Sequence, residues 1–192
     1  MAVQRDSKQE WDHEVDFLIA GSGAASLTAA LVAKDAGLEP LILEMTDMFG
    51  GSTAMSGGVI WIPNNPVMKR SGVADSYQEA RAYLDACVGD VGPSSSPERR
   101  HAFLEEGPKA VEYLESKGMC FVHPEGYSDY HEGEFPGGKS RSRSLVAKIF
   151  DARALGEWRT KLRRNSERDI PIQLSELRDL AMNGRGMKSK LA

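Results

Sequence analysis

The sequence predicts an α/β fold that begins with a βαβ unit of about thirty residues. Three observations predict it. A short apolar run from Val15 to Ala20 ends at a glycine turn, residues 24–36 have helical composition, and a second apolar run occupies residues 40–44. The first run shows no alternation of polar and apolar residues, so we expect a strand buried on both faces of a parallel sheet.

The predicted helix between the two strands suits close packing against a sheet. Gly37 stands at the position of a helix C-cap glycine and predicts where the helix ends. The helix offers four small residues to the sheet: Ala25, Ala29, Ala33 and Ala36.

The middle of the chain changes from a glycine-rich loop to helices. Residues 46–65 combine glycine, serine and isolated apolar residues, which predicts a long functional loop with a short helix near residues 52–55. Ser76 and Glu79 match a capping box that opens a helix through Val88. Ser96 followed by Pro97 predicts the start of an interrupted helix that continues to about Lys117 and ends at Gly118.

The last third of the chain is less regular. Residues 119–122 are a plausible strand, and residues 123–144 are rich in Gly, Pro, Tyr and Ser, with strands uncertain. Beyond Phe150 the pattern is helical but polar, and residues 183–192 have no evident packing role.

Composition and charge indicate a soluble globular protein. Of the 192 residues, 41% are hydrophobic and 27% charged, and the net charge of −4 argues against a general nucleic-acid binder. No apolar run approaches the roughly 18 residues that span a bilayer, and Met1 to Trp11 is too polar for a signal peptide. The two cysteines suggest neither a disulfide framework nor a metal site. We therefore expect a cytoplasmic protein.

The glycine turn after the first strand has the composition of a phosphate site. Gly21 would make the tight turn, and Gly23 would let a pyrophosphate approach the backbone at the helix N-terminus. Ser26 replaces the usual third glycine. Glu44 ends the second strand about twenty residues on, where a carboxylate accepts hydrogen bonds from ribose hydroxyls. The alternative is an ordinary βαβ turn with Glu44 as a surface acid.

A second glycine cluster follows Glu44. Gly50-Gly51 and Gly57-Gly58 allow the main chain to lie against a flat or extended ligand. Ser52, Thr53 and Ser56 add hydroxyl groups between them. A purely structural loop seldom needs this density of glycine and hydroxyl groups.

Together these segments resemble the FAD-binding domain of the fumarate reductase/succinate dehydrogenase flavoprotein superfamily. Four further motifs make the chain similar to the 3-ketosteroid (3-oxosteroid) dehydrogenase branch, over residues 12–164 at least. These motifs are Val59-Ile-Trp-Ile-Pro-Asn-Asn65, Gly126-Tyr-Ser-Asp-Tyr-His131, Pro136-Gly-Gly138 and Phe150-Asp-Ala-Arg-Ala-Leu-Gly156.

The resemblance implies a Rossmann-like FAD-binding domain, incomplete, with the start of an inserted α+β substrate domain. It divides the chain into a polar tail (1–12), the FAD-binding domain (13–118) and the start of a substrate or cap region (119–192). It assigns the FAD pyrophosphate to Gly21, Ser22, Gly23, Ala25 and Ser26. It assigns the adenosine ribose to Glu44, and the ribityl chain and flavin ring to Gly51, Ser52, Ser56, Gly57 and Gly58.

For catalysis, the resemblance implies that Tyr130 borders the steroid pocket and supports a proton-abstracting tyrosine. Family members are more than twice as long as this chain. We therefore expect the base, the residues that hold the steroid carbonyl and the returning part of the FAD domain to be missing here. From the residues alone, Tyr127 and Tyr130 would be half-buried loop aromatics.

Other chemistry-bearing residues favour plainer interpretations. His123 and His131 have no third ligand nearby, which makes a metal site improbable. The basic run from Lys139 to Ser144 predicts a solvated strand or loop, and Trp61 predicts core or pocket wall. Neither cysteine has a neighbour in sequence that would make its thiol reactive.

The leading functional hypothesis is an FAD-dependent oxidoreductase acting on CH–CH groups. As the resemblance has it, a base removes a proton beside the activated carbonyl of a 3-ketosteroid or another hydrophobic enone, and a hydride passes to the flavin. The sequence leaves the electron acceptor open. The second hypothesis is a non-catalytic nucleotide-binding fragment. The third is an NAD(P)-dependent dehydrogenase, which the glycine cluster after Glu44 disfavours.

Overall fold

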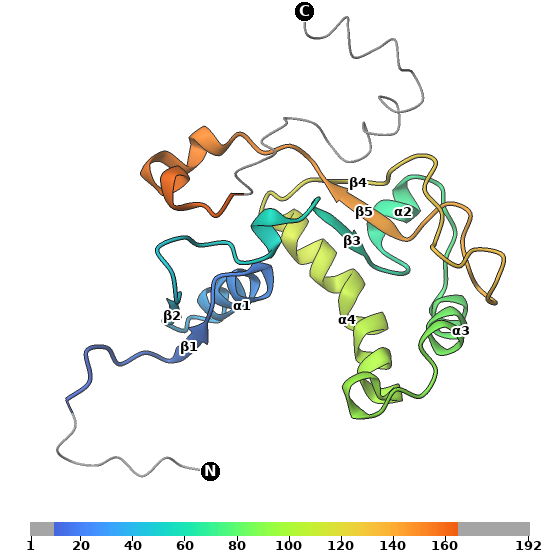
Figure 1. Ribbon diagram of the computed structural model, residues 1–192, viewed down its shortest axis with the longest axis horizontal. Helices are drawn as coiled ribbons and strands as arrows, with labels where there is room; N and C mark the ends of the chain where they lie inside the picture. The colour runs from blue at the N-terminus through green and yellow to red at the C-terminus, as the bar shows by residue number, and fades with distance from the viewer. Residues whose placement is uncertain (1–9, 165–192) are drawn as a thin grey trace, which may run out of the picture. The chain divides into compact units, whose positions relative to one another are not determined.

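The computed structural model describes residues 10–164, which form two compact units (Figure 1). The first unit contains residues 10–55 and 153–164, and the second contains residues 56–152. Each unit has its own sheet, with the strand orders β1-β2 and β3-β5-β4.

The first unit contains the predicted βαβ arrangement. Strand β1 (Phe17–Ala20) leads into helix α1 (Ala24–Asp35), and β2 (Pro40–Leu43) follows. The strands are parallel, with Phe17 opposite Pro40 and Ala20 opposite Leu43. Gly37, at φ +77°, follows the helix as predicted. Its N–H donates to Lys34 O, and the next N–H donates to Ala33 O, both at 3.0 Å, which satisfies the last carbonyls of the helix.

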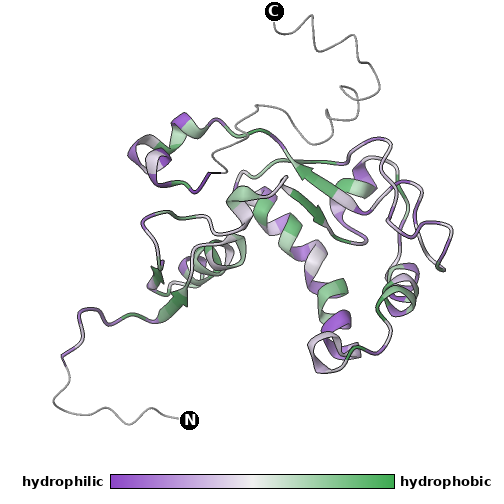
Figure 2. Ribbon diagram, in the orientation of Figure 1, coloured by the Kyte–Doolittle hydropathy of each residue, from purple (hydrophilic) through white to green (hydrophobic). Residues whose placement is uncertain are grey.

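The prediction that β1 is buried on both faces is wrong within the described residues. Ile19 is 8% exposed, but Phe17 is 40% and Leu18 61% exposed, although the strand is apolar (Figure 2). A strand becomes buried on both faces when layers cover both sides of its sheet. Among residues 10–164, β2 is the one partner strand of β1, and of the four small helix residues Ala33 alone is buried.

The glycine-rich segment is only partly a loop. The predicted short helix is present as η1 (Thr53–Met55), but β3 (Val59–Trp61) and then α2 (Pro66–Arg70) follow it. Strand β3 pairs antiparallel with β5 (Ser144–Ala147), which lies far along the sequence. That distance explains why local composition does not reveal the strand.

The two longer helices of the second unit begin where their caps predict. Helix α3 (Tyr77–Val88) has Ser76 as its N-cap, and the Ser76 side chain accepts from Glu79 N at 3.2 Å. Helix α4 (Pro97–Ser116) follows η2 (Pro93–Ser95) and is continuous, not interrupted. Its buried face holds it together across Pro108, because burial outweighs local propensity.

The core of the second unit lies between α4 and the three-stranded sheet. Strand β4 (Phe121–Val122) pairs with β5, and the face of the sheet packs on the helices. A Cβ atom on Gly107 of α4 would lie 3.0 Å from Ile62 Cγ2, so helix and strand segment approach closely. The core consists of Val67, Val111, Phe121 and Leu145, surrounded by Ile60, Ile62, Leu114 and Ala147.

The described chain ends with η3 (Ala152–Lys161), two short 3-10 segments separated by a bend at Gly156. The predicted functional boundary at residue 118 falls inside the second unit, because β4 shares a sheet with β3. As a division of function it stays a prediction. The polar tail is described only from Glu10, and residues 183–192 lie outside the described part. Between residues 10 and 164 no helix is long and apolar enough to cross a membrane.

Candidate functional site

The turn after β1 presents backbone N–H groups at the start of α1. Gly21 has φ +87°, a conformation that favours glycine, and its N–H donates to Leu43 O at 2.7 Å. Gly23 is the N-cap and has no side chain to cap the helix, and Ala24 N–H donates instead to Thr53 Oγ1 at 3.2 Å. The first-turn amides have no acceptor within the helix, so with the helix dipole they favour an anion there.

The second glycine segment packs directly against this turn. Gly51 has φ +55°, and a Cβ atom there would lie 3.2 Å from Gly23 Cα. Gly50 N–H donates to the buried Ser22 Oγ at 3.0 Å. The structure therefore brings together two segments that the sequence predicts to bind one ligand.

Glu44 follows β2 and joins the same cluster. The Ser22 hydroxyl donates to its Oε2, while Thr46 N donates to Oε1 at 3.1 Å. The Ser22 hydroxyl, followed by the Thr46 N–H, lowers the pKa of Glu44 below its ordinary value. An ionised carboxylate only accepts hydrogen bonds, so this group suits hydroxyl donors such as those of a ribose.

The remaining predicted cofactor residues lie in two places. Ala25 and Ser26 belong to the first turn of α1, and Ser52 is exposed beside η1 in the same unit. Ser56, Gly57 and Gly58 belong to the second unit and lead into β3, where Gly58 N–H donates to Ser56 Oγ at 3.2 Å. Their contacts with a flavin stay a prediction.

Tyr130 lies in the second unit with its side chain fully exposed (100%). The residues on both sides of it are fixed. Asp129 N donates to Lys139 O at 2.9 Å, and His131 N donates to Tyr83 Oη at 3.2 Å. The backbone therefore holds the Tyr130 phenol in solvent, and its role at a substrate pocket stays a prediction. Tyr127 is half-buried.

A buried ionic network fixes this tyrosine-bearing segment. Arg143, in the run predicted to be solvated, has a fully buried side chain. Its Nε and Nη2 donate to Asp75 at 2.8 Å, and its Nη1 donates to Asp129 at 2.6 Å. Trp61 Nε1 also donates to Asp129, at 2.8 Å. The solvation prediction is wrong for Arg143, because two carboxylates far along the sequence compensate its charge, whereas Ser140 and Arg141 of the same run are exposed.

The charges of the network stabilise one another. Burial alone would lower the pKa of Arg143, but Asp75 and Asp129 raise it above its ordinary value. Burial opposes ionisation of Asp75 as well, yet the hydrogen bonds and charge of Arg143 lower its pKa. The aromatic rings of Trp61 and Tyr83 lie 5.7 and 5.3 Å from the guanidinium carbon. Trp61 is thus part of the interior wall, as predicted.

Other polar groups are engaged within the fold. His123 Nε2 lies 2.6 Å from Ser142 O, and His131 Nδ1 lies 2.9 Å from Glu134. Within residues 10–164 there is no cluster of three His, Cys, Asp or Glu side chains that could hold a metal ion. Cys87 and Cys120 are free thiols.

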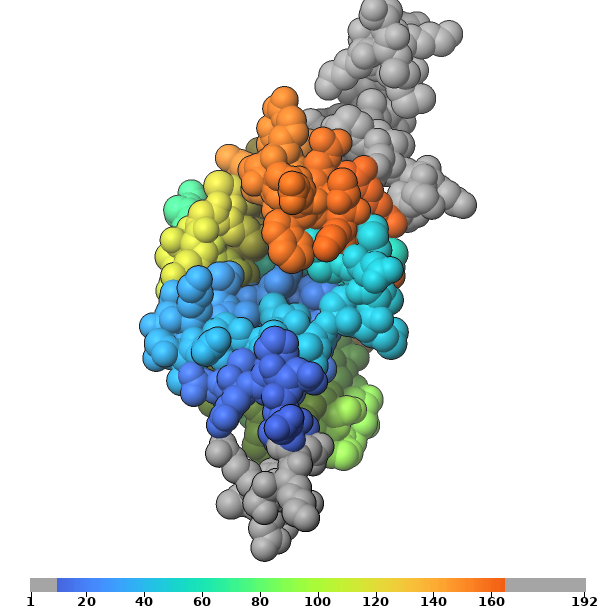
Figure 3. All heavy atoms as spheres, turned by 90° about the vertical axis from the view of Figure 1, so that its left-hand side faces the viewer, coloured from blue at the N-terminus to red at the C-terminus, as the bar shows by residue number. Residues whose placement is uncertain are grey.

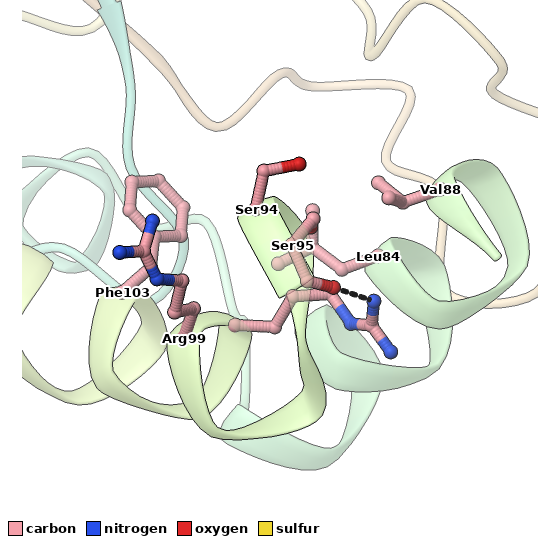
Figure 4. Close-up of a pocket in the computed structure, with 7 residues that line it drawn as sticks. Leu84, Val88, Ser94, Ser95, Arg99 and Phe103 are labelled. Carbon is pink, nitrogen blue, oxygen red and sulfur yellow. Dashed lines mark hydrogen bonds between the residues drawn. The ribbon is translucent and has the colours of Figure 1, made fainter. Parts of the chain in front are cut away.

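A surface hollow between α3, η2 and α4 contains none of the predicted site residues (Figure 4). Arg100 lies in it but is bound by Asp85 at 2.9 Å and by Ser95 O at 2.5 Å. The hollow is lined by Leu84, Val88, Ser94, Ser95, Arg99, Arg100 and Phe103.

One residue of the cluster around Glu44 carries no signal in the sequence. Arg163 Nη2 donates to Thr46 Oγ1 at 2.7 Å, although the two residues are 117 positions apart. Thr46 is the first residue of the glycine-rich segment, but nothing in its local sequence predicts a contact with Arg163. The hydrogen bond between these two residues becomes evident only in the folded structure.

The fold and the paired glycine segments define a class of protein. The family model "FAD binding domain" matches residues 16–185, and the chain belongs to this family. FAD is therefore the cofactor for which the domain is built, and the predicted α/β, Rossmann-like fold class is confirmed.

Within this family, the chain is similar to dehydrogenases that act on cyclic ketones. The 3-oxosteroid 1-dehydrogenase of Mycolicibacterium smegmatis is 45% identical over 146 residues, which are 74% of this chain and 25% of that protein. The 4-oxocyclohex-2-ene-1-carboxylate 5-dehydrogenase of Sinomonas cyclohexanicum is 35% identical over 82% of this chain and 26% of its own length. The predicted likeness to 3-ketosteroid dehydrogenases is confirmed.

A solved structure agrees. The 3-ketosteroid Δ1-dehydrogenase of Sterolibacterium denitrificans, in complex with 1,4-androstadiene-3,17-dione, matches with a TM-score of 0.79 and 32% identity over 91% of this chain and 31% of that one. The chain thus spans about a quarter to a third of the length of these relatives.

Proposed function

We propose that this chain supplies the FAD-binding part of a dehydrogenase that oxidises a CH–CH bond beside a ketone, with 3-ketosteroids as the substrate class. The observation that carries the proposal is the contact between the two glycine segments next to Glu44 in the first unit. The names of the relatives support the substrate class.

The residues of the first unit fit FAD. The first-turn amides of α1 that follow Ala24 suit its diphosphate, and the ionised Glu44 suits its adenosine ribose. Ser22 orients Glu44 and Gly50 through one hydroxyl group. Bound FAD would supply the acceptor for a hydride, and the protein would supply binding and orientation.

Tyr130 is the proposed substrate-facing residue of this chain. Its backbone is fixed on both sides while its hydroxyl is free of burial. A phenol in this position can donate a hydrogen bond to a second hydroxyl or to a carbonyl. Ser56, Gly57 and Gly58 are proposed to line the flavin.

The test is to purify the chain and titrate it with FAD. We expect flavin absorbance in the purified protein or saturable quenching of added FAD, with NAD(P)H binding no tighter than ADP. A colourless chain that rejects FAD contradicts the proposal, and preferential binding of NAD(P)H favours a nicotinamide enzyme.

A second measurement separates an enzyme from a binding module. If the chain contains the residues needed for catalysis, anaerobic addition of a 3-ketosteroid should bleach the bound flavin. A chain that binds FAD but is never bleached is the non-catalytic fragment of the alternative hypothesis. Cytoplasmic location and the lack of a nucleic-acid partner stay predictions from composition.

A further inference from the structure

Arg163 is fixed against the second glycine segment by its own backbone. Phe49 and Leu162 form a parallel bridge, in which Phe49 N donates to Lys161 O at 2.9 Å and Arg163 N donates to Phe49 O at 2.8 Å. The Phe49 ring also packs edge-on against Trp158, with ring centroids 6.1 Å apart. Figure 3 shows residues 153–164, in orange, against the cyan loop that contains Phe49.

The guanidinium of Arg163 is one hydroxyl group away from Glu44. Its Nη2 donates to Thr46 Oγ1 at 2.7 Å, and Thr46 Oγ1 lies 3.2 Å from Glu44 Oε1. The arginine therefore belongs to the Glu44 cluster, which we propose above to bind the adenosine ribose.

One donor of this arginine has no acceptor. Within residues 10–164, Arg163 Nε is a buried side-chain nitrogen without a hydrogen-bond partner. A buried donor on a charged group is costly when it is left unpaired, so such an atom calls for an explanation. A ligand that accepts this N–H would remove the cost.

The chemistry of the neighbouring turn indicates which ligand. The turn from Gly21 to Ser26 contains no basic side chain. Its amides and the helix dipole, equivalent to about half a positive charge, would hold the doubly charged diphosphate. Arg163 brings the full positive charge that this turn lacks.

We propose that Arg163 binds the adenosine diphosphate half of FAD and that residues 153–164 are therefore part of the cofactor site. The proposal rests on the proposed function, because it takes FAD as the ligand. It names a residue outside both glycine segments, and neither segment predicts it.

The experiment compares Arg163→Gln with Arg159→Gln in the purified chain. Arg159 lies in the same segment with an exposed side chain, so both variants lose one positive charge. Flavin quenching measures FAD affinity, and calorimetry measures ADP affinity. We expect R163Q to weaken both ligands about 10-fold, which is about 1.4 kcal/mol, and R159Q to weaken neither.

The unfolding temperature separates binding from folding. Without ligand, R163Q should unfold near the wild-type temperature, because it removes an unpaired donor along with one hydrogen bond. With FAD, the rise in unfolding temperature should be smaller than in the wild type. Should R163Q fail to fold, Arg163→Lys keeps the charge but lacks the Nε donor and should still bind FAD and ADP more weakly.

The outcomes are distinct. Wild-type affinity in R163Q or R163K overturns the inference, as does a loss for FAD without a loss for ADP. If the wild-type chain binds neither ligand, the proposed function fails and the inference fails with it.

Discussion

Arg143 in the second unit and Arg163 in the first are both held by partners far along the sequence. Arg143 has acceptors for each of its three nitrogens, from Asp75, Asp129 and Gly137 O. Within residues 10–164, Arg163 has Thr46 as an acceptor at one nitrogen and a buried Nε without any. In this part of the chain every nitrogen of the Arg143 guanidinium has an acceptor, whereas one nitrogen of Arg163 has none.

Unpaired donors distinguish a ligand-binding arginine from a structural one. A buried charge that is fully compensated stabilises the fold, and its removal leaves its partners buried and unpaired. A buried donor without an acceptor in the described residues is available to a ligand. Substitutions in the two units test this difference.

The largest effect is expected for Arg143→Met. The substitution leaves Asp129 buried without the guanidinium and Asp75 with Lys139 Nζ at 3.8 Å, so we expect a loss of about 3–5 kcal/mol in the free energy of unfolding. Urea unfolding followed by tryptophan fluorescence measures it. Arg141→Met is the control, because Arg141 is exposed and makes one hydrogen bond to Ser71 O. Equal stability of the two variants would show that the network does not hold the fold.

Next comes Gly51→Ala, which forces a Cβ against Gly23 Cα at 3.2 Å. The separation of the glycine segments should reduce FAD affinity about 10-fold, or about 1.4 kcal/mol. Gly72→Ala is the matched control, since Gly72 also has positive φ (+68°) but open space around it. Stability should fall in both variants and FAD affinity in the first alone. A loss of affinity in both would mean that backbone strain, not contact, is responsible.

Ser22→Ala should have a moderate effect that depends on pH. The Ser22 hydroxyl is the main cause of the lowered pKa of Glu44, so its removal raises that pKa. The charged carboxylate binds ribose above its pKa and is lost as pH falls through it, so FAD binding should weaken at a higher pH in the variant. At pH 7 we expect about a threefold loss from one hydrogen bond. FAD titrations between pH 7 and 4 measure both, with Glu44→Gln as the control that abolishes this pH dependence. If the pH profile of FAD binding is the same in the Ser22→Ala variant and the wild type, Ser22 does not control the ionisation of Glu44 in binding.

The smallest effect is expected for Ser76→Ala, which removes the N-cap of α3 beside Asp75. Loss of an exposed cap such as this one costs about 0.5 kcal/mol. Ser96→Ala removes the cap of α4 and serves as the comparison. The unfolding temperature should fall by the same amount in both variants. A clearly larger loss in S76A would show that the cap and the Arg143 network act as one unit.

Local signals account for what the sequence predicts well. The turn at Gly21, the cap at Ser76 and the Ser96-Pro97 pair each act within a few residues. They therefore place β1, α1, α3 and α4 correctly. The resemblance to a flavoprotein family rests on the Gly21 turn, on residues 44–58 and on four further motifs, and it identifies the cofactor.

Pairing over long distances accounts for what the sequence does not reveal. Strand β3 forms because β5 lies beside it, and Arg143 is buried because Asp75 and Asp129 meet it there. The local sequence around Lys139 to Ser144 contains only the basic side chains, so it indicates solvent. Arg163 is missed for the same reason, since Thr46 is 117 residues away.

The bridge between Phe49 and Leu162 has a consequence for modularity. The chain leaves the first unit after Met55 and returns to it at Arg153, and the bridge joins the two arms. Within the described residues, the segment 56–152 is therefore inserted between two paired arms of the first unit. Domain insertion is tolerated where the chain ends that flank it lie close together, so this segment can change while the bridge still closes the first unit.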